Sequence, residues 1–107
     1  MRIHNIEEFK GGWFLGDFEP SLFKTDQFEV CYKQHGKGEV WPKHFHKSAT
    51  EFNCLILGSM VIQNIHLRPG DVFVIEPGEI ADPVFLEDCH LIIVKIPSIP
   101  GDKYEIP

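Results

Sequence analysis

Short apolar segments alternate with polar turns along the chain, and this pattern predicts β-strands rather than helices. Residues 28–34 alternate strictly, which places Phe28, Val30 and Tyr32 on one face of an expected strand. Similar short apolar segments recur as far as Ile96, and glycine, proline, asparagine or aspartate bounds them at regular intervals. No long amphipathic stretch interrupts them. The pattern is typical of an all-β sandwich or barrel.

Two turns are specified by their own chemistry. Gln63-Asn64 separates the apolar segments 60–62 and 65–67, which predicts a hairpin with a two-residue loop. Residues 68–71, Arg-Pro-Gly-Asp, predict a second turn, because proline presets φ and glycine accepts positive φ. These turns therefore delimit short strands in the middle of the chain.

Length and charge indicate a single globular domain and argue against several classes of partner. The chain has 107 residues, of which 43% are apolar, and this suffices for one hydrophobic core. The formal net charge is −6 without a basic run, which argues against nucleic acids and anionic membranes as partners. No apolar stretch is long enough for a transmembrane helix, and the charged N-terminus does not resemble a secretory signal. We expect a single cytoplasmic domain.

Three cysteines, Cys31, Cys54 and Cys89, are far apart and form no Cys-x-x-Cys pair. Their odd number favours reduced thiols in a cytoplasmic setting. A catalytic cysteine remains an alternative, although burial as a small apolar side chain is the commoner role. On a strand that points Glu51 and Asn53 inward, Cys54 faces the other way.

The candidate chemistry is concentrated between residues 38 and 58. His44 and His46 are two residues apart, so they share a face of a strand, and Glu51 follows after a short connection. If the two strands are neighbours, two imidazoles and a carboxylate converge. This ligand set suits a divalent first-row metal that keeps open positions for water or substrate. Histidines at this spacing are also common as polar surface residues.

Flanking glycines extend this segment into a longer pattern. From Gly38 to Gly58 the chain reads Gly, five residues, His-x-His, four residues, Glu, six residues, Gly. The segment resembles the first sequence motif of the cupin superfamily at every fixed position. The resemblance implies a single-domain cupin-like jelly-roll β-barrel, the double-stranded β-helix, with a metal bound by His44, His46 and Glu51.

A second cupin motif is only partly present downstream. Gly70 and Gly78 match it, whereas Glu76 replaces a proline and Phe85 replaces an asparagine. Ala81 stands where the family has a histidine, the usual fourth metal ligand.

Asp82 follows Ala81 directly and is the candidate replacement for the fourth ligand. A shift of one residue turns a side chain to the other face of a strand, unless a β-bulge corrects it. The neighbouring Pro83 favours irregular backbone here. The alternative is that Asp82 is a solvated turn residue.

Other residues near the site follow from the alternation of the Glu51 strand. If Glu51 points inward, so do Asn53, Leu55 and Leu57. We expect Asn53 to orient Glu51 or to bridge a buried water. The remaining histidines are expected at the surface: His4, His35, His66 and His90.

The resemblance covers residues 28–97, the expected barrel core. Residues 1–27 form an extension that packs on the barrel or on a partner subunit, and residues 98–107 form a tail. The extension contains Trp13, Phe14, Phe18 and Phe23, which are too apolar to remain in water. A homodimer, by resemblance, and burial within the monomer are both open.

The metal constellation implies three classes of function. The first is a metal-dependent enzyme of isomerase, lyase or dioxygenase type that acts on a small polar metabolite in the barrel mouth, with zinc, iron, manganese or nickel. The second is a non-catalytic module that binds a small ligand. The third is an accessory cupin whose metal stabilises the fold. Cupins span such activities, so the fold does not choose among them.

Overall fold

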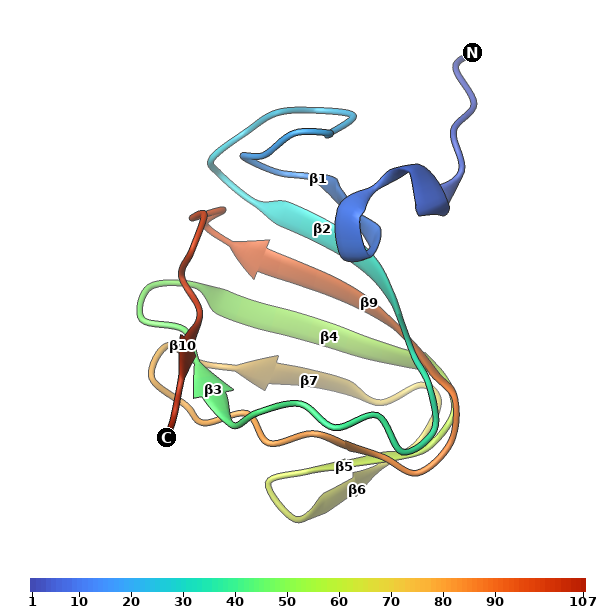
Figure 1. Ribbon diagram of the computed structural model, residues 1–107, viewed down its shortest axis with the longest axis vertical. Coiled ribbons are helices and arrows are strands. Elements are labelled where there is room, and N and C mark those ends of the chain that lie inside the picture. Colours follow the sequence, from blue (N-terminus) through green and yellow to red (C-terminus); the bar gives the residue numbers. More distant parts are fainter.

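The computed structural model describes residues 1–107, and its strands form three antiparallel sheets (Figure 1). The largest sheet has the strand order β1-β2-β9-β4-β7. Its strands are β1 (Trp13–Leu15), β2 (Glu29–His35), β4 (Thr50–Leu57), β7 (Val72–Ile75) and β9 (Cys89–Ile96). The all-β prediction is confirmed. No helix in the structure has the length and apolar character needed to cross a membrane.

Two smaller sheets and two short helical turns complete the fold. A three-stranded sheet contains β6 (Ile65–Leu67), β5 (Met60–Ile62) and β8 (Val84–Phe85), and β10 (Tyr104–Glu105) pairs with β3 (His44–Phe45). Two 3-10 turns, Ile6–Glu8 and Lys10–Gly12, precede β1. The predicted extension therefore contributes β1, an edge strand, to the large sheet.

The hairpin predicted around Gln63-Asn64 is confirmed. β5 and β6 pair antiparallel, with Ile62 opposite Ile65, so the loop contains two residues. Both loop residues have positive φ, 50° for Gln63 and 61° for Asn64. Positive φ at both central positions is the geometry that matches the twist of the flanking strands.

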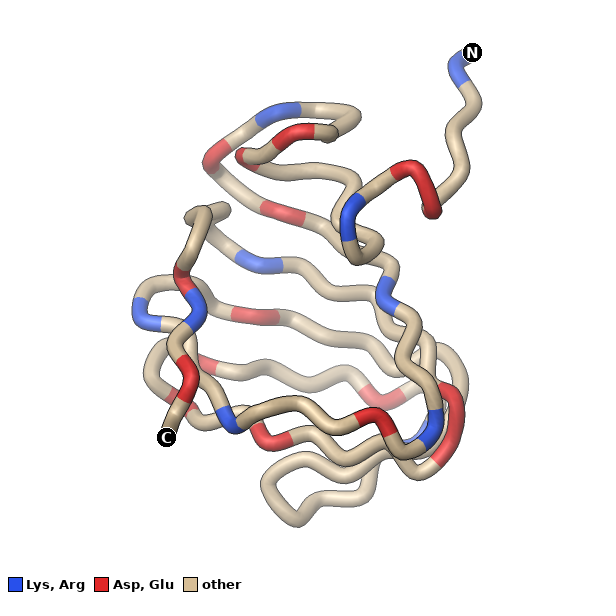
Figure 2. Tube along the Cα trace, in the orientation of Figure 1, with Lys and Arg blue, Asp and Glu red and all other residues tan.

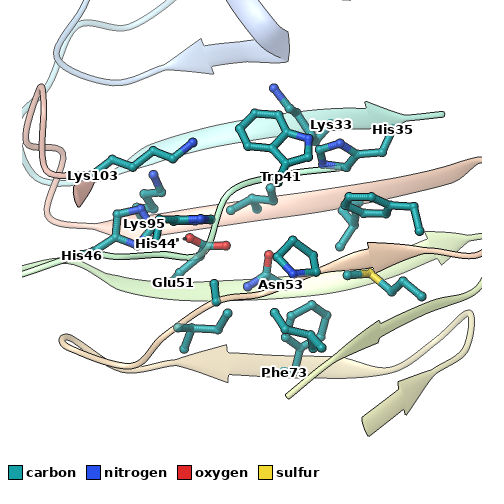
Figure 3. A pocket seen from close by; sticks show the side chains of 18 of the residues that line it. Lys33, His35, Trp41, His44, His46, Glu51, Asn53, Phe73, Lys95 and Lys103 are labelled. Carbon is teal, nitrogen blue, oxygen red and sulfur yellow. Dashed lines mark ion pairs between the residues drawn. The ribbon is translucent and has the colours of Figure 1, made fainter. Parts of the chain in front are cut away.

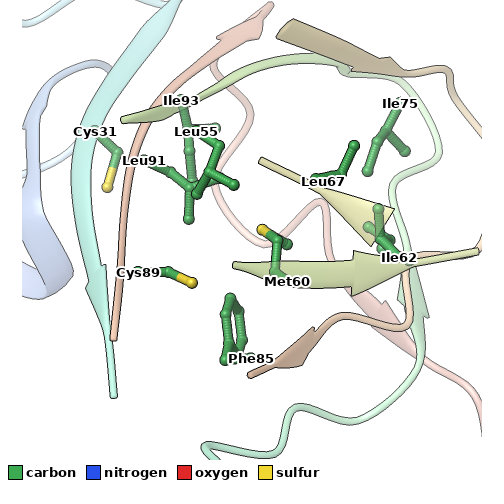
Figure 4. Packing of buried hydrophobic residues seen from close by; sticks show 11 residues of the cluster. Cys31, Leu55, Met60, Ile62, Leu67, Ile75, Phe85, Cys89, Leu91 and Ile93 are labelled. Carbon is green, nitrogen blue, oxygen red and sulfur yellow. The ribbon is translucent and has the colours of Figure 1, made fainter. Parts of the chain in front are cut away.

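A hydrophobic core fills the space between the large sheet and the β5-β6-β8 sheet (Figure 4). Leu55 on β4 and Leu91 on β9 are cross-strand partners that point into this space. Cys31 and Cys89 are fully buried, and all three cysteines are free. Burial raises the pKa of the Cys31 thiol to about 12, so this cysteine stays protonated and acts as a small apolar side chain.

The expectation that Leu57 points inward is wrong. The pairing of β4 with β9 shifts register between Leu55 and Leu57, and Leu57 is 50% exposed. A bulge adds a residue on one strand, so the side chains beyond it no longer follow the alternation. The alternation holds at the other end of β4, where Asn53 and Leu55 are buried.

The C-terminal tail holds the loop between β3 and β4. The carboxylate of Asp102 accepts hydrogen bonds from the backbone amides of Lys47, Ser48 and Ala49, at 3.0, 3.1 and 3.0 Å. Burial alone would raise the pKa of Asp102, but these three amides hold the pKa below its ordinary value. The Asp102 carboxylate thus joins the tail to the loop through hydrogen bonds from three backbone amides.

The outer face of the large sheet is apolar and uncharged at its centre. Phe52 lies beside Val74 and Val94 in register, and Cys54 lies beside Val72 and Ile92. Phe52, Val72 and Val74 are exposed. A contiguous apolar face on a chain of net charge −6 is typical of a surface that a second copy covers. The expected homodimer therefore remains a prediction, now located on this face.

The Asp102 clamp predicts a pH-dependent loss of stability. Asp102→Asn should lower the free energy of unfolding at pH 7 by about 2 kcal/mol, since the amide offers a neutral acceptor and adds a donor. Because the folded-state pKa is lowered, the contribution of Asp102 is present above its unfolded pKa and is lost as pH falls through the folded value. Urea unfolding at pH 7 and pH 3 measures this, with Asp17→Asn as the control. An equal loss at both pH values would contradict the clamp.

The apolar outer face predicts self-association. Sedimentation velocity of the wild-type chain should show a dimer, and Val74→Lys should shift it to monomer because a buried, unpaired ammonium is costly. Val40→Lys, a change at an exposed position away from this face, is the control and should leave the dimer intact. A wild-type monomer, or equal association of both variants, would show that the face is not an interface.

Candidate functional site

A cavity of about 190 Å³ opens between the large sheet and the segments that cover it (Figure 3). One part of its wall is apolar and includes Met60, Ile62 and Phe85. Another part carries the predicted site residues together with cationic and aromatic side chains. The polar members of the wall are Lys33, His35, His44, His46, Glu51, Asn53, Lys95 and Lys103.

Backbone pairing fixes the position of each predicted ligand. His44 exchanges two backbone hydrogen bonds with Ala81, at 3.1 and 2.8 Å, and its strand pairs with β10. The carbonyl of His46 accepts a hydrogen bond from the amide of Gly78 at 2.7 Å. Glu51 lies on β4, directly opposite Lys95 on β9.

The structure brings His44, His46 and Glu51 to the same part of the wall. The ring centroids of His44 and His46 are 5.4 Å apart with an interplanar angle of 80°. His46 Nδ1 lies 3.6 Å from Glu51 Oε2. His44 Nδ1 lies 3.0 Å from the carbonyl oxygen of Pro42, and a proton on Nδ1 would leave Nε2 available to a ligand.

These donors match a divalent metal in type but do not form a closed site. No group of three histidine, cysteine, aspartate or glutamate side chains is close enough to hold an ion. His46 Nε2 is nevertheless buried without a hydrogen-bond partner, which is unusual for a buried polar atom. The His44 contact with a backbone carbonyl is also the kind of contact that orients metal-binding imidazoles. The donor chemistry therefore fits, whereas convergence of three ligands requires side-chain rearrangement.

His46 is held neutral at physiological pH. Burial, together with the nearby charges of Lys95 and His44, lowers its pKa to about 4, although the charge of Asp102 opposes them. A neutral imidazole retains the lone pair that a metal or a hydrogen-bond donor requires.

The structure does not bring Asp82 to the other candidate ligands. Ala81 is buried in the cavity wall, opposite His44 in the bridge between their segments. Asp82 Oδ1 instead accepts a hydrogen bond from the backbone amide of Gln63 at 2.9 Å, and Asp82 is absent from the cavity wall. With Ala81 facing inward, the next residue faces away, as the period of a strand requires.

Asn53 lies in the cavity wall, as the alternation of β4 predicts. It is buried, and its Nδ2 atom has no hydrogen-bond partner. No hydrogen bond joins it to Glu51, so its expected orienting role is not seen in this arrangement. Two buried polar atoms without partners, His46 Nε2 and Asn53 Nδ2, thus occur among the residues of one cavity.

Sequence reasoning did not identify the cationic and aromatic part of the wall. Lys33 on β2, Lys95 on β9 and Lys103 before β10 line the cavity with Trp13 and Trp41. The signal for two of the lysines was present, because alternation from Cys31 leads to Lys33 and alternation from Ile93 leads to Lys95. Lys103 reaches the cavity only through the pairing of β10 with β3.

The surface expectation is wrong for His35. His35 lines the cavity, stacks on Phe85 with ring centroids 4.0 Å apart and hydrogen-bonds through Nδ1 to Glu39. Burial lowers the pKa of His35 more than its contact with Glu39 raises it. The strand β2 extends through His35, so the residue continues the inward alternation instead of lying in a turn. His4 and His66 are exposed, and His90 is half-buried against Tyr32.

Comparison with known proteins places the fold. No protein-family model matches the chain, and a search of curated proteins finds no match. Among solved structures, an uncharacterised protein with a double-stranded β-helix domain from Klebsiella pneumoniae is similar with a TM-score of 0.70 and 19% identity, over 97% of this chain and 90% of that one.

Two further structures share the fold at low identity. The DMSP lyase DddQ from Ruegeria pomeroyi has a TM-score of 0.72 at 15% identity, and the match covers 87% of this chain and 49% of the lyase. A cupin-2 domain protein from Shewanella frigidimarina has a TM-score of 0.55 at 20% identity, over 67% of this chain and 72% of that one. Together with the sheet topology, these likenesses show that the chain has the double-stranded β-helix fold.

Proposed function

We propose that the cavity binds a small polar metabolite beside a divalent metal ion held by His44, His46 and Glu51. The observation that carries the proposal is the buried, unpartnered Nε2 atom of His46, on an imidazole whose other nitrogen lies 3.6 Å from Glu51. Because Glu51 lies beside Nδ1, the His46 ring would have to flip for one ion to contact both Nε2 and Glu51. Such an ion would satisfy Nε2 and would offset the negative charge of Glu51. When bound, such an ion can polarise a substrate oxygen or activate a water molecule.

Each residue of the cavity wall has its own role in this proposal. His46, neutral at pH 7, offers a nitrogen lone pair, and Glu51 supplies the only carboxylate in the cavity wall. The Pro42 carbonyl holds one nitrogen of His44 and leaves the other for binding. The apolar wall around Met60 and Phe85 excludes water from part of the cavity, which strengthens polar contacts to a ligand.

Catalysis and binding without turnover remain two candidate functions of this cavity. One structural neighbour is a lyase by name, so a chain of this fold can be an enzyme. Ala81, at the place of the fourth ligand, favours binding without turnover, because loss of a ligand is easier to tolerate where no reaction is required. Zinc, iron, manganese and nickel all suit a ligand set of two imidazoles and a carboxylate.

Metal content after loading tests the proposal. The wild-type chain, dialysed against each metal and then freed of excess, should retain about one ion per chain by elemental analysis. Glu51→Gln keeps the shape of the side chain but removes its charge, and it should weaken retention at least about tenfold, as should His46→Ala.

His66→Ala is the matched control, because His66 is an exposed histidine outside the cavity. It should retain metal as the wild type does. Circular dichroism of each variant confirms that the fold persists. Metal retention that is absent in the wild type, or equal in Glu51→Gln, His46→Ala and His66→Ala, would refute the metal site.

A further inference from the structure

Three lysines from different parts of the chain line one cavity (Figure 3). The ammonium groups of Lys33 and Lys103 lie 5.4 and 4.2 Å from the centroid of the Trp41 ring. The ammonium of Lys95 lies 4.8 Å from the centroid of the Trp13 ring. Each charge is thus positioned against an aromatic face, which attracts cations and limits their movement.

The charge of this cavity is opposite to that of the chain. The chain has 16 acidic and 10 basic residues, yet only one acidic residue, Glu51, and three basic ones line the cavity. The lysine and glutamate side chains of the wall together carry three positive charges and one negative charge, a sum of +2. Figure 2 shows acidic residues spread along the rest of the chain. The cationic cavity is therefore a local feature that the overall composition conceals.

No carboxylate neutralises these lysines at close range. The ion pairs of the structure join His4 to Glu8, Lys24 to Glu19, His35 to Glu39 and His46 to Glu51, and none includes a cavity lysine. The one close polar contact is that of Lys33 Nζ with the carbonyl oxygen of Gly11, at 3.1 Å.

Ammonium groups gathered in one cavity wall repel one another. Partial burial and the neighbouring charge of Lys95 lower the pKa of Lys103, although the charge of Glu105 opposes them. Like charges are held together stably where an oppositely charged partner offsets the cost. Glu51 is the only carboxylate in the cavity wall, where three ammonium groups gather. Glu29, opposite Lys95 on the neighbouring strand, and Glu105, close to Lys103, lie outside the wall, so an anion bound inside the cavity would add the negative charge that the wall lacks.

We infer that the ligand of this cavity is a small organic anion, whose negatively charged oxygens face Lys95 and Lys103 and whose apolar body lies against Met60 and Phe85. The inference rests on the proposed function, since it names the chemical class of the metabolite. Carboxylate and phosphate oxygens share the chemistry that the lysines recognise. The apolar part of the wall favours a ligand with a carbon body over an inorganic ion.

The two tryptophans of the chain both line the cavity, so intrinsic fluorescence reports its occupancy. Phenylacetate is a suitable probe, because it combines a carboxylate with an apolar ring, and phenylacetamide is its neutral counterpart. Titration should give a saturable change with phenylacetate and a roughly tenfold or larger loss of affinity with phenylacetamide. Inorganic phosphate should compete with phenylacetate but bind more weakly.

Substitution of single lysines tests which side chains recognise the carboxylate of phenylacetate. Lys95→Gln and Lys103→Gln should each weaken phenylacetate binding roughly tenfold and leave phenylacetamide binding nearly unchanged. Lys43→Gln is the control, because Lys43 is exposed and outside the cavity. The preference for the anion should persist after chelation and dialysis of any metal.

Each alternative result has a defined meaning. Equal binding of phenylacetate and phenylacetamide, or equal loss in all three lysine variants, overturns the inference and leaves small-molecule binding intact. Absence of binding by both compounds also overturns it, while metal retention tests the proposed metal site separately. Phosphate that binds as tightly as phenylacetate would contradict an organic ligand. Loss of the anion preference after chelation would assign recognition to the metal instead of the lysines.

Discussion

The antiparallel pairing of β4 with β9 is the constraint on which the cavity depends. Its register sets Glu51 opposite Lys95, Asn53 opposite Ile93 and Leu55 opposite Leu91. Because alternate side chains of both strands point to the same face, these pairs form a wall that changes from charged to apolar along the strands. A shift of one residue would turn the whole set to the outer face of the sheet. The chemistry of the site and the packing of the core thus follow from one register.

The opposite wall depends on segments that β4 and β9 do not hold directly. His44 is fixed by its bridge to Ala81, and the loop after it is fixed by the Asp102 carboxylate. The segment that supplies Asp102 also supplies Lys103 to the cavity, so the tail both positions the histidine loop and contributes to the wall. Binding at this site should therefore be sensitive to changes in the tail, which lies far from the motif in sequence.

Much of the fold could be predicted from local patterns, because strand alternation and turn chemistry act over a few residues. The Gln63-Asn64 hairpin and the inward direction of Asn53 and Leu55 are examples. Leu57 departs from the predicted inward direction because a bulge depends on pairing with a partner strand. The motif located His44, His46 and Glu51, whereas the convergence of Lys33, Lys95 and Lys103 depends on which strands become neighbours. Sequence spacing contains no such information for residues so far apart.

The most direct test of the cationic cavity is a crystal structure of the protein grown with 4-bromobenzoate, whose bromine can be located by anomalous scattering. We predict a bromine peak inside the cavity, with the carboxylate oxygens within hydrogen-bond distance of Lys95 or Lys103 and the ring against the apolar wall. Bromine peaks confined to the outer surface, or a carboxylate that points away from both lysines, would contradict an anion-binding cavity.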